Sequence, residues 1–211
     1  KPKYLNTNNS PIYNKSRNLY GVHFYKKPSE ITIVEGYLDA IYCKYIFPES
    51  LPLSSCGTSF SFDHALTVKR LLAKDGKVSV FVDGDTAGTA AALRTIKALT
   101  ELNVIPKIII PPAGMDPADC FARAEEETGN FKFLHIDNAY KFVVDNTKDL
   151  DEITTVFERC RNIYTRMEIS RKIQEFLPQY PQSGIYDLIS AKYSEYAIND
   201  AANEMVRMGK A

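Results

Sequence analysis

Runs of apolar residues alternate with amphipathic segments through the first half of the chain. The apolar runs at 31–35, 51–58, 77–83 and 104–111 predict buried strands, because each is short and rich in Ile, Val, Leu or Phe. The segments between them, at 36–47, 63–74 and 86–102, have the apolar spacing of helices. Strands that alternate with helices of this length predict an α/β fold with a mostly parallel sheet and right-handed crossovers.

The same pattern predicts details of the helices and of the two ends of the chain. The helix over 36–47 is expected to place its apolar positions at Leu38, Ile41, Tyr42 and Tyr45. From about residue 117 the pattern is helical throughout, with breaks near 146–151 and 178–184 and a longest segment over 154–177. We therefore expect an all-α subdomain after the α/β region. Residues 1–30 show no sustained periodicity and are expected to form loops with a short strand at 19–25.

Composition places the chain among ordinary globular proteins, with 211 residues, 45% of them hydrophobic and 25% charged. No apolar run approaches the roughly 20 residues that cross a bilayer, and no signal-peptide pattern opens the chain. The first residue is Lys1 rather than Met, so we expect a fragment of a longer protein. The cysteines are far apart and form no C-x-x-C pair, which argues against zinc and for reduced thiols in a cytosolic protein.

The net charge is zero, but basic residues concentrate at the start of the chain. Residues 1–30 contain six Lys or Arg residues and one acidic residue, Glu30, and they are also rich in Tyr and Asn. Such a basic leader could contact phosphates and stack on bases. On composition alone, a solvated arm is the simpler interpretation.

Two acidic residues stand where the first predicted strand turns into the first predicted helix. Glu35 follows four apolar residues, so we expect it to be partly desolvated, with a raised pKa suited to proton transfer. Asp39 lies four residues further on, on the same side of the helix. An acidic residue favoured by the helix dipole is the simpler interpretation of Asp39, whereas nothing comparable explains Glu35.

Two further acidic pairs follow later strands. Asp83 and Asp85 of the sequence DGD come at the end of strand 77–83, and Asp116 and Asp119 of DPAD open the helix expected at 117. Turn formation and N-capping explain either pair taken alone. Because the carboxyl ends of parallel strands meet at one edge of a sheet, however, three such sites indicate one acidic cluster. Oxygen ligands without His or Cys nearby select Mg²⁺ or Mn²⁺, which support phosphoryl chemistry.

Other candidate sites are weaker. The histidines His23, His64 and His135 are isolated, and we expect each to be structural or solvated rather than a ligand. The sequence contains neither the G-x-x-x-x-G-K-[ST] pattern of a P-loop nor the G-x-G-x-x-G pattern of a dinucleotide site. The acidic cluster therefore remains the leading candidate for chemistry.

Taken together, the motifs resemble a known family. EGY-x-D at 35–39, GTS at 57–59, DGD-x-AG at 83–88 and GMDPAD at 114–119 resemble the Toprim domain. The leader sequences KYLN at 3–6 and KSRNLYG at 15–21 are similar to the stretch that precedes Toprim in bacterial DnaG-type primases. The resemblance implies a Toprim-like, mostly parallel sheet flanked by helices and followed by a helical subdomain. It also implies the catalytic core of a DNA primase, a nucleotidyltransferase that makes short RNA primers on single-stranded DNA.

The resemblance implies roles for individual residues. Glu35 matches a glutamate of acid–base chemistry or metal positioning, and with Asp83 and Asp85 it forms the implied catalytic set. The implied ligands of Mg²⁺ or Mn²⁺, more than one ion and no zinc, are Glu35, Asp83, Asp85, Asp116 and Asp119. The implied nucleic-acid or nucleotide contacts are Lys3, Tyr4, Asn6, Lys15, Arg17, Asp39, Gly57 and Thr58. Because Ala118 replaces the second Asp of the family's DPD motif, either Asp119 takes over that role or one metal is held more weakly.

The resemblance also implies a domain plan and partners. We expect residues 1–29 to end the N-terminal core subdomain, 30–128 to form the Toprim catalytic domain and 129–211 to form a helical subdomain. The implied partners are single-stranded DNA, ribonucleoside triphosphates and, through a region absent here, a replicative helicase. The implied location is the cytoplasm, without a membrane, in a bacterial, phage or organellar setting. Two alternatives stay open: a Toprim nuclease or topoisomerase-type enzyme that cleaves DNA, and a non-catalytic nucleic-acid-binding module.

Overall fold

A computed structural model describes residues 8–24, 27–57, 59–160, 163–176 and 178. Contacts between residues divide the chain into two compact units, Lys1–Ala139 and Tyr140–Ala211. We describe each unit by itself. Within the described ranges, no helix combines the length and the apolar character needed to cross a membrane.

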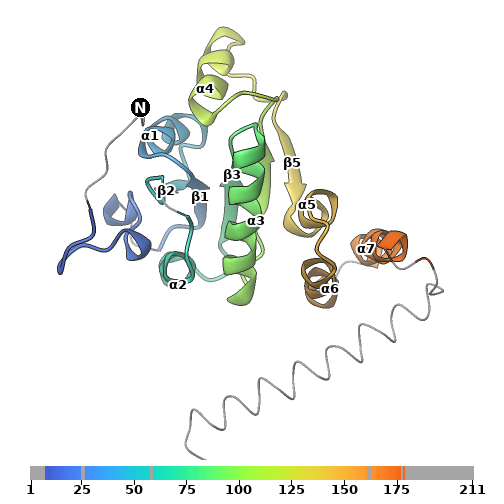
Figure 1. Cartoon of the computed structure of the whole chain (residues 1–211). Helices are drawn as coiled ribbons and strands as arrows, with labels where there is room; N and C mark the ends of the chain where they lie inside the picture. Colours follow the sequence, from blue (N-terminus) through green and yellow to red (C-terminus); the bar gives the residue numbers. More distant parts are fainter. Residues whose placement is uncertain (1–7, 25–26, 58, 161–162, 177, 179–211) are drawn as a thin grey trace, which may run out of the picture. The chain divides into compact units, whose positions relative to one another are not determined.

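The first unit is built on a sheet that, among the described residues, has five strands (Figure 1). In chain order these are β1 (Glu30–Val34), β2 (Leu51–Ser54), β3 (Lys77–Phe81), β4 (Lys107–Ile110) and β5 (His135–Asn138). Their order in space is β2-β1-β3-β4-β5, with β1 to β4 parallel and β5 antiparallel to β4. The predicted α/β fold with a mostly parallel sheet is thus confirmed.

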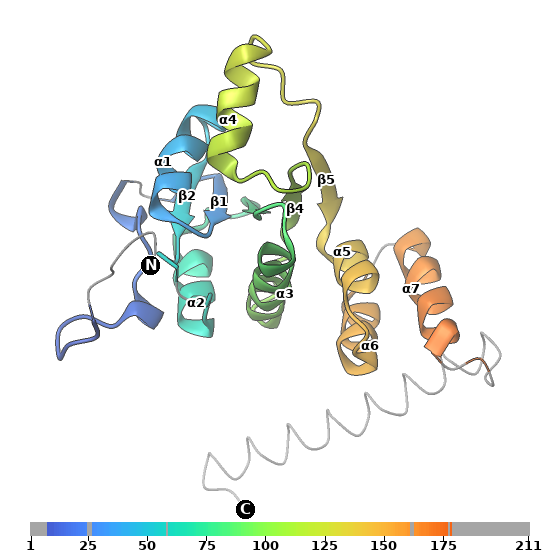
Figure 2. The ribbon, with the colours of Figure 1, turned by 45° about the horizontal axis from the view of Figure 1, so that its top comes forward.

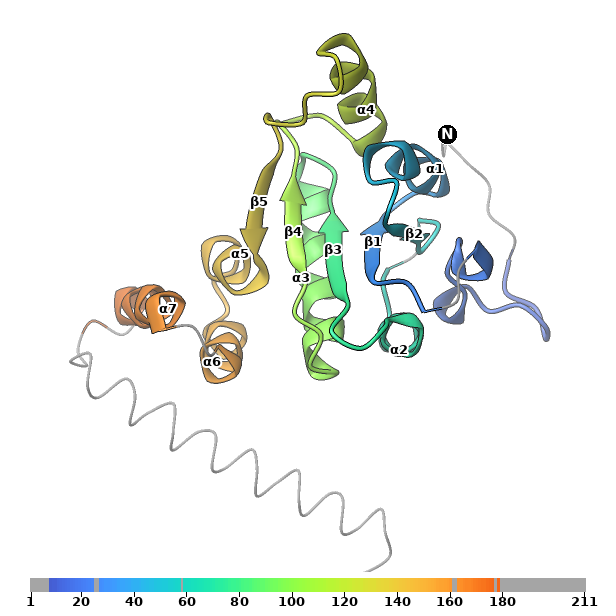
Figure 3. The same ribbon diagram turned by 180° about the vertical axis from the view of Figure 1, so that it is seen from behind.

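Helices cover both faces of this sheet. The connecting helices are α1 (Tyr37–Ile46), α2 (Phe62–Leu71) and α3 (Thr86–Glu101), and α4 (Pro117–Glu126) follows β4. Right-handed connections place α1 on one face and α2 and α3 on the other. Accordingly, α1 packs against α4, and α2 packs against α3 (Figure 2). Seen from behind, α3 lies on the far side of β3 and β4 (Figure 3).

Helix α1 packs on the sheet through a face that the sequence pattern did not predict. Its buried residues are Ala40, Cys43 and Ile46, which join a core with Phe81 of β3. The apolar positions of the predicted helical spacing, Leu38, Ile41, Tyr42 and Tyr45, are 37–67% exposed. Two of them, Tyr42 and Tyr45, contact the Phe121 ring of α4, with centroids 5.8 and 5.4 Å apart. The helix lies where the sequence predicted it, but its predicted apolar positions are not its buried residues.

The leader joins the sheet by a bridge rather than by a strand. Its described part contains two 3-10 turns, η1 (Lys15–Arg17) and η2 (Val22–Phe24), so the strand expected at 19–25 was wrong. Tyr20 pairs with Ser54 of β2 through an antiparallel bridge. At Gly21 the backbone φ is +98°, and a Cβ would collide with the carbonyl oxygen of Pro52. This approach to β2 therefore requires glycine.

The region after residue 126 differs in part from the helical prediction. Strand β5 was not predicted, because only one of its four residues, Ile136, is apolar and most of them are exposed. The helices that follow are α5 (Ala139–Asn146), α6 (Leu150–Arg159) and α7 (Ile163–Phe176). The break near 146–151 is confirmed, but the long helix expected over 154–177 is interrupted at Cys160. Most of the break expected at 178–184 lies outside the described residues.

The second unit has its own small core. Helices α6 and α7 contact each other, and the fully buried residues Ile153, Ile169 and Ile173 come from these two helices. The apolar spacing of the sequence is therefore correct for this pair of helices, although the boundary between them was not predicted.

Candidate active site

The carboxyl ends of β1 and β3 lie side by side where the order of the strands reverses. From β1 the chain runs to β2 on one side, returns past β1 to β3, and continues to β4 on the other side. Ligands of open α/β sheets bind in the crevice at such a reversal. Glu35 directly follows β1 and Asp83 follows β3 by two residues, so the fold brings both to this crevice.

Asp83 is the central carboxylate of the site. Its side chain is half-buried, and its Oδ1 atom is buried without a hydrogen-bond partner in the described part of the chain. Burial, followed by the negative charges of Glu35, Asp39, Asp116 and Asp85, raises the pKa of Asp83 to about 7. The structure therefore brings five of the predicted acidic residues within electrostatic reach of one another.

Two glycines of the DGD-x-AG motif explain why Asp83 is buried. The Gly84 N–H donates to the Met115 carbonyl at 2.8 Å, and the Gly114 N–H donates to the Gly84 carbonyl at 2.8 Å. A Cβ on Gly84 would collide with the backbone of this loop, and a Cβ on Gly88 would collide with the backbone of Asp83. Only glycine lets the loop and the start of α3 approach Asp83 this closely.

Glu35 differs from its prediction. Its side chain is exposed, so the expected partial desolvation was wrong. The apolar strand ends at Val34, and the chain leaves the sheet at Glu35. The fold holds its backbone instead, because its carbonyl accepts hydrogen bonds from Ser54 Oγ at 2.7 Å and from the Gly57 N–H at 3.3 Å.

Asp39 and Asp85 each cap the start of a helix. Asp85 Oδ1 accepts the Gly88 N–H at 2.7 Å, and Asp39 Oδ2 accepts the Gly36 N–H at 2.9 Å. Capping accounts for one oxygen of each carboxylate, as the simpler interpretation of the sequence anticipated. Both residues still act on Asp83 through their charge.

Asp116 and Asp119 cap each other at the start of α4. The Asp119 N–H donates to Asp116 Oδ1 at 2.8 Å, and the Asp116 N–H donates to Asp119 Oδ2 at 3.1 Å. Asp116 is among the charges that raise the pKa of Asp83, whereas Asp119 is not. Of this pair, the structure therefore brings Asp116 to the cluster and leaves the exposed Asp119 at its margin.

The carboxylates do not form a ready-made metal centre. Over the described ranges, no three His, Cys, Asp or Glu side chains are arranged to hold a metal ion. The donor chemistry nevertheless fits a hard divalent cation, because all the acidic ligands are oxygens. The buried Oδ1 of Asp83 is an acceptor that still needs a partner.

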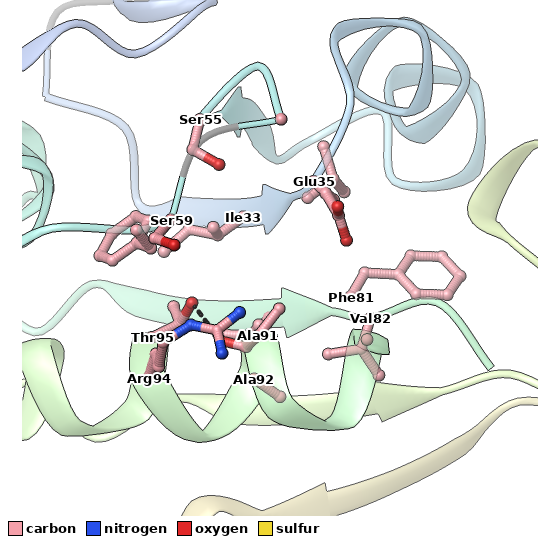
Figure 4. A pocket seen from close by; sticks show the side chains of 15 residues that line it. Ile33, Glu35, Ser55, Ser59, Phe81, Val82, Ala91, Ala92, Arg94 and Thr95 are labelled. Carbon is pink, nitrogen blue, oxygen red and sulfur yellow. Dashed lines mark hydrogen bonds between the residues drawn. The ribbon is translucent and has the colours of Figure 1, made fainter. Parts of the chain in front are cut away.

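A pocket of about 150 Å³ has Glu35 of the acidic cluster in its lining. The ends of β1 and β3, the segment 55–60 and helix α3 line it. Figure 4 shows Glu35 beside it at the end of β1 and Arg94 reaching toward it from α3. Sequence reasoning missed Arg94, and its position two helical turns after the DGD motif was the available signal. Within the described part of the chain, the side chain of Arg94 makes neither a hydrogen bond nor an ion pair. Its positive charge is therefore available to an anion.

Comparison with known proteins relates this chain to a family of domains. A family of Toprim-like domains matches residues 32–121. The chain is 32% identical over 195 residues to a DNA primase of Streptomyces coelicolor, covering 83% of this chain and 30% of that protein. It is 31% identical over 226 residues to a DNA primase of Clostridium acetobutylicum, covering 100% of this chain and 36% of that protein. This chain is a Toprim-containing segment related to DnaG-type primases.

Solved structures show the same fold. The RNA polymerase domain of the Mycobacterium tuberculosis primase DnaG matches with a TM-score of 0.63 and 24% identity, over 83% of this chain and 61% of that chain. A DnaG primase catalytic domain bound to single-stranded DNA matches with a TM-score of 0.59 and 21% identity, over 87% of this chain and 63% of that chain. The Toprim-like sheet is thus confirmed. The chain spans about a third of the length of the curated primases it matches.

The remaining predicted contacts lie along the leader and the GTS turn. Lys15 and Arg17 belong to η1, beside the start of α2, and Arg17 Nε donates to half-buried Asp63 at 3.2 Å. Gly57 is exposed in the turn after β2, with φ +72°. The other predicted contacts, Lys3, Tyr4, Asn6 and Thr58, lie outside the described residues. Lys15 and Arg17 of the leader thus lie beside α2 rather than at the carboxylate cluster.

Proposed function

We propose that this chain is the Toprim part of a DNA primase core, which joins ribonucleotides on a single-stranded DNA template. One observation carries the proposal: Asp83 places a buried, unpartnered oxygen among like charges, one of which, Glu35, lines a pocket. An acidic group held in this way is typical of a functional site, since a bound cation would relieve the repulsion. The similarity to DNA primases supports this assignment.

The carboxylates divide the chemistry among them in this proposal. Asp83 and Asp85, together with Glu35 and Asp116, hold Mg²⁺ or Mn²⁺, and Asp119 is the more remote candidate. When bound, such an ion neutralises phosphate charge and acts as a Lewis acid on the phosphoryl group. Glu35 is exposed beside the pocket, so its carboxylate can accept a proton from an attacking hydroxyl or help to orient the metal.

In this proposal the basic leader binds the nucleic acid. Lys15 and Arg17 contact backbone phosphates of the template, a contact that weakens as salt rises. Asp39 and Gly57 border the nucleotide, and the proposed contacts of Lys3, Tyr4, Asn6 and Thr58 complete the set. Ribonucleoside triphosphates as substrates, a helicase as partner and the division at residues 29 and 128 remain predictions.

The test compares Asp83→Asn with a control that removes an equivalent charge elsewhere. Asp75→Asn is that control, because Asp75 is exposed and its φ of +61° suits Asn. We expect template-dependent oligoribonucleotides and Mn²⁺ binding in the wild type and in Asp75→Asn. Both should decrease about 100-fold or more in Asp83→Asn, as expected when an essential charged group is lost.

Three outcomes distinguish the possible functions. Synthesis that depends on Asp83 supports the primase. Template cleavage without synthesis would show the Toprim nuclease instead. Mn²⁺ binding that is unaltered in Asp83→Asn, without metal-dependent chemistry, would leave a nucleic-acid-binding module.

A further inference from the structure

The leader is fastened to the domain at two places. At the first, the Tyr20 N–H donates to the Ser54 carbonyl at 2.9 Å, and the Ser54 N–H donates to the Tyr20 carbonyl at 3.2 Å. Ser54 Oγ in turn donates to the carbonyl of Glu35 at 2.7 Å. At the second place, η1 contacts the start of α2. The leader is therefore tied both to the strand end that carries Glu35 and to α2.

His64 forms the second attachment. It is the third residue of α2, and Ser61 Oγ accepts its N–H at 3.1 Å. In return, His64 Nδ1 accepts the Ser61 N–H at 3.2 Å, so histidine replaces the usual Glu or Gln of a capping box. Because Nδ1 accepts a hydrogen bond, the proton of the neutral ring is on Nε2. Nε2 therefore donates to the carbonyl of Lys15 at 3.0 Å.

Burial strengthens this attachment. His64 is 0% exposed, and its ring packs against Phe60 with centroids 5.4 Å apart. Burial lowers the pKa of His64, which keeps the ring neutral. Without the leader, Nε2–H would be a buried donor with no partner, which is unfavourable. Ser61 Oγ also donates to the Ser16 carbonyl at 2.5 Å, so two consecutive leader carbonyls are held.

We infer that His64 is a positioning residue that fixes η1, and with it Lys15 and Arg17, in a set place relative to Glu35. The inference rests on the proposed function, in which these two basic residues contact the template. Asn14 supports the same turn from the exposed side, because its Oδ1 accepts both the N–H and the Oγ–H of Ser16, at 3.0 and 2.8 Å.

His64→Asn and His64→Gln separate the two hydrogen bonds of the ring. The amide oxygen of Asn replaces Nδ1 and keeps the cap, but Asn does not reach Lys15; the amide nitrogen of Gln replaces Nε2 and keeps the bond to the leader. The measurements are affinity for a fluorescent single-stranded oligonucleotide and amide exchange at residues 15–18. We expect His64→Asn to bind about three- to tenfold more weakly and to exchange faster. His64→Gln should stay within about twofold of the wild type in affinity.

Asn14→Ala tests the same inference without altering the core, because Asn14 is exposed. It should also weaken binding, and its effect should not add to that of His64→Asn. Equal losses in His64→Asn and His64→Gln, or wild-type affinity in both His64→Asn and Asn14→Ala, would overturn the positioning role.

The double variant Lys15→Ala/Arg17→Ala separates this inference from the proposed function. Unchanged affinity in the double variant would refute the leader–template contact itself. Reduced affinity there, combined with wild-type affinity in His64→Asn and Asn14→Ala, would refute the positioning role alone.

Discussion

Replacing Asp83 with Asn keeps the shape of the side chain and removes one charge from a half-buried acidic cluster. The pKa of Asp83 is raised from 3.8 to about 7 in the folded chain. Between these two values the folded chain keeps the proton that the unfolded chain has lost, so stability decreases as pH rises. Above pH 7 both states are ionised, and the destabilisation is constant. Asn has no proton to lose and should avoid this effect.

The size of the effect follows from the pKa difference. A difference of about three units at about 1.36 kcal/mol each gives an upper limit of about 4 kcal/mol. Solvent and salt screen the repulsion between these partly exposed carboxylates, so we expect about 2–4 kcal/mol. The free energy of unfolding of a folded domain is typically roughly 5–15 kcal/mol, so this effect is a large share of it.

Urea unfolding between pH 4 and pH 8.5, with EDTA present to remove divalent ions, measures this difference. The two proteins should have nearly equal free energies of unfolding near pH 4, and Asp83→Asn should be more stable at pH 8. Titrating groups that do not interact with Asp83 are common to both proteins and cancel in the difference. An Asp83→Asn variant no more stable than the wild type at pH 8, or a gap that does not change with pH, would refute burial of Asp83 among like charges.

Three further predictions use the same structure. Adding Mn²⁺ to 100 times its Kd should stabilise the wild type by about 2.7 kcal/mol and leave Asp83→Asn unchanged, as measured by thermal unfolding. Asp63→Asn should raise the affinity for single-stranded DNA about two- to fivefold in a fluorescence titration, because it frees the exposed Arg17 for phosphate. Gly88→Ala should destabilise the fold by about 1–3 kcal/mol in urea unfolding, since its Cβ would collide with the Asp83 backbone.

The sheet could be predicted from sequence because its central strands carry unambiguous patterns. The buried runs that became β1 and β3 are short, apolar and bounded by polar residues, and helices of ordinary length separate them. Strand β5 could not be found in this way. Its residues HIDN include only one apolar residue and are mostly exposed, and they form a strand because they pair with the edge of β4.

The orientation of α1 could not be predicted from the periodicity of its apolar residues, for a different reason. The helix is apolar on several sides, so spacing alone gives no single face to the sheet. Small buried side chains at Ala40 and Cys43 bring the helix close to the strands, while larger residues such as Tyr45 remain outside and contact α4. His64 was given no specific role and Arg94 was missed. Their surroundings, the leader for His64 and the pocket for Arg94, come from distant parts of the chain.

The members of the acidic cluster could be named from sequence, but not their environments. Glu35 follows a buried strand and yet is exposed, whereas Asp83 is covered by a loop more than twenty-five residues away in the chain. The covering loop can approach only because Gly84 has no side chain, and the start of α3 can approach the Asp83 backbone only because Gly88 has none. The motif DGD-x-AG therefore encodes two things at once: the carboxylates and the close packing that holds one of them in an unfavourable charge environment. If a cation relieves that repulsion, as we propose, the close packing that these glycines allow also favours binding of the cation.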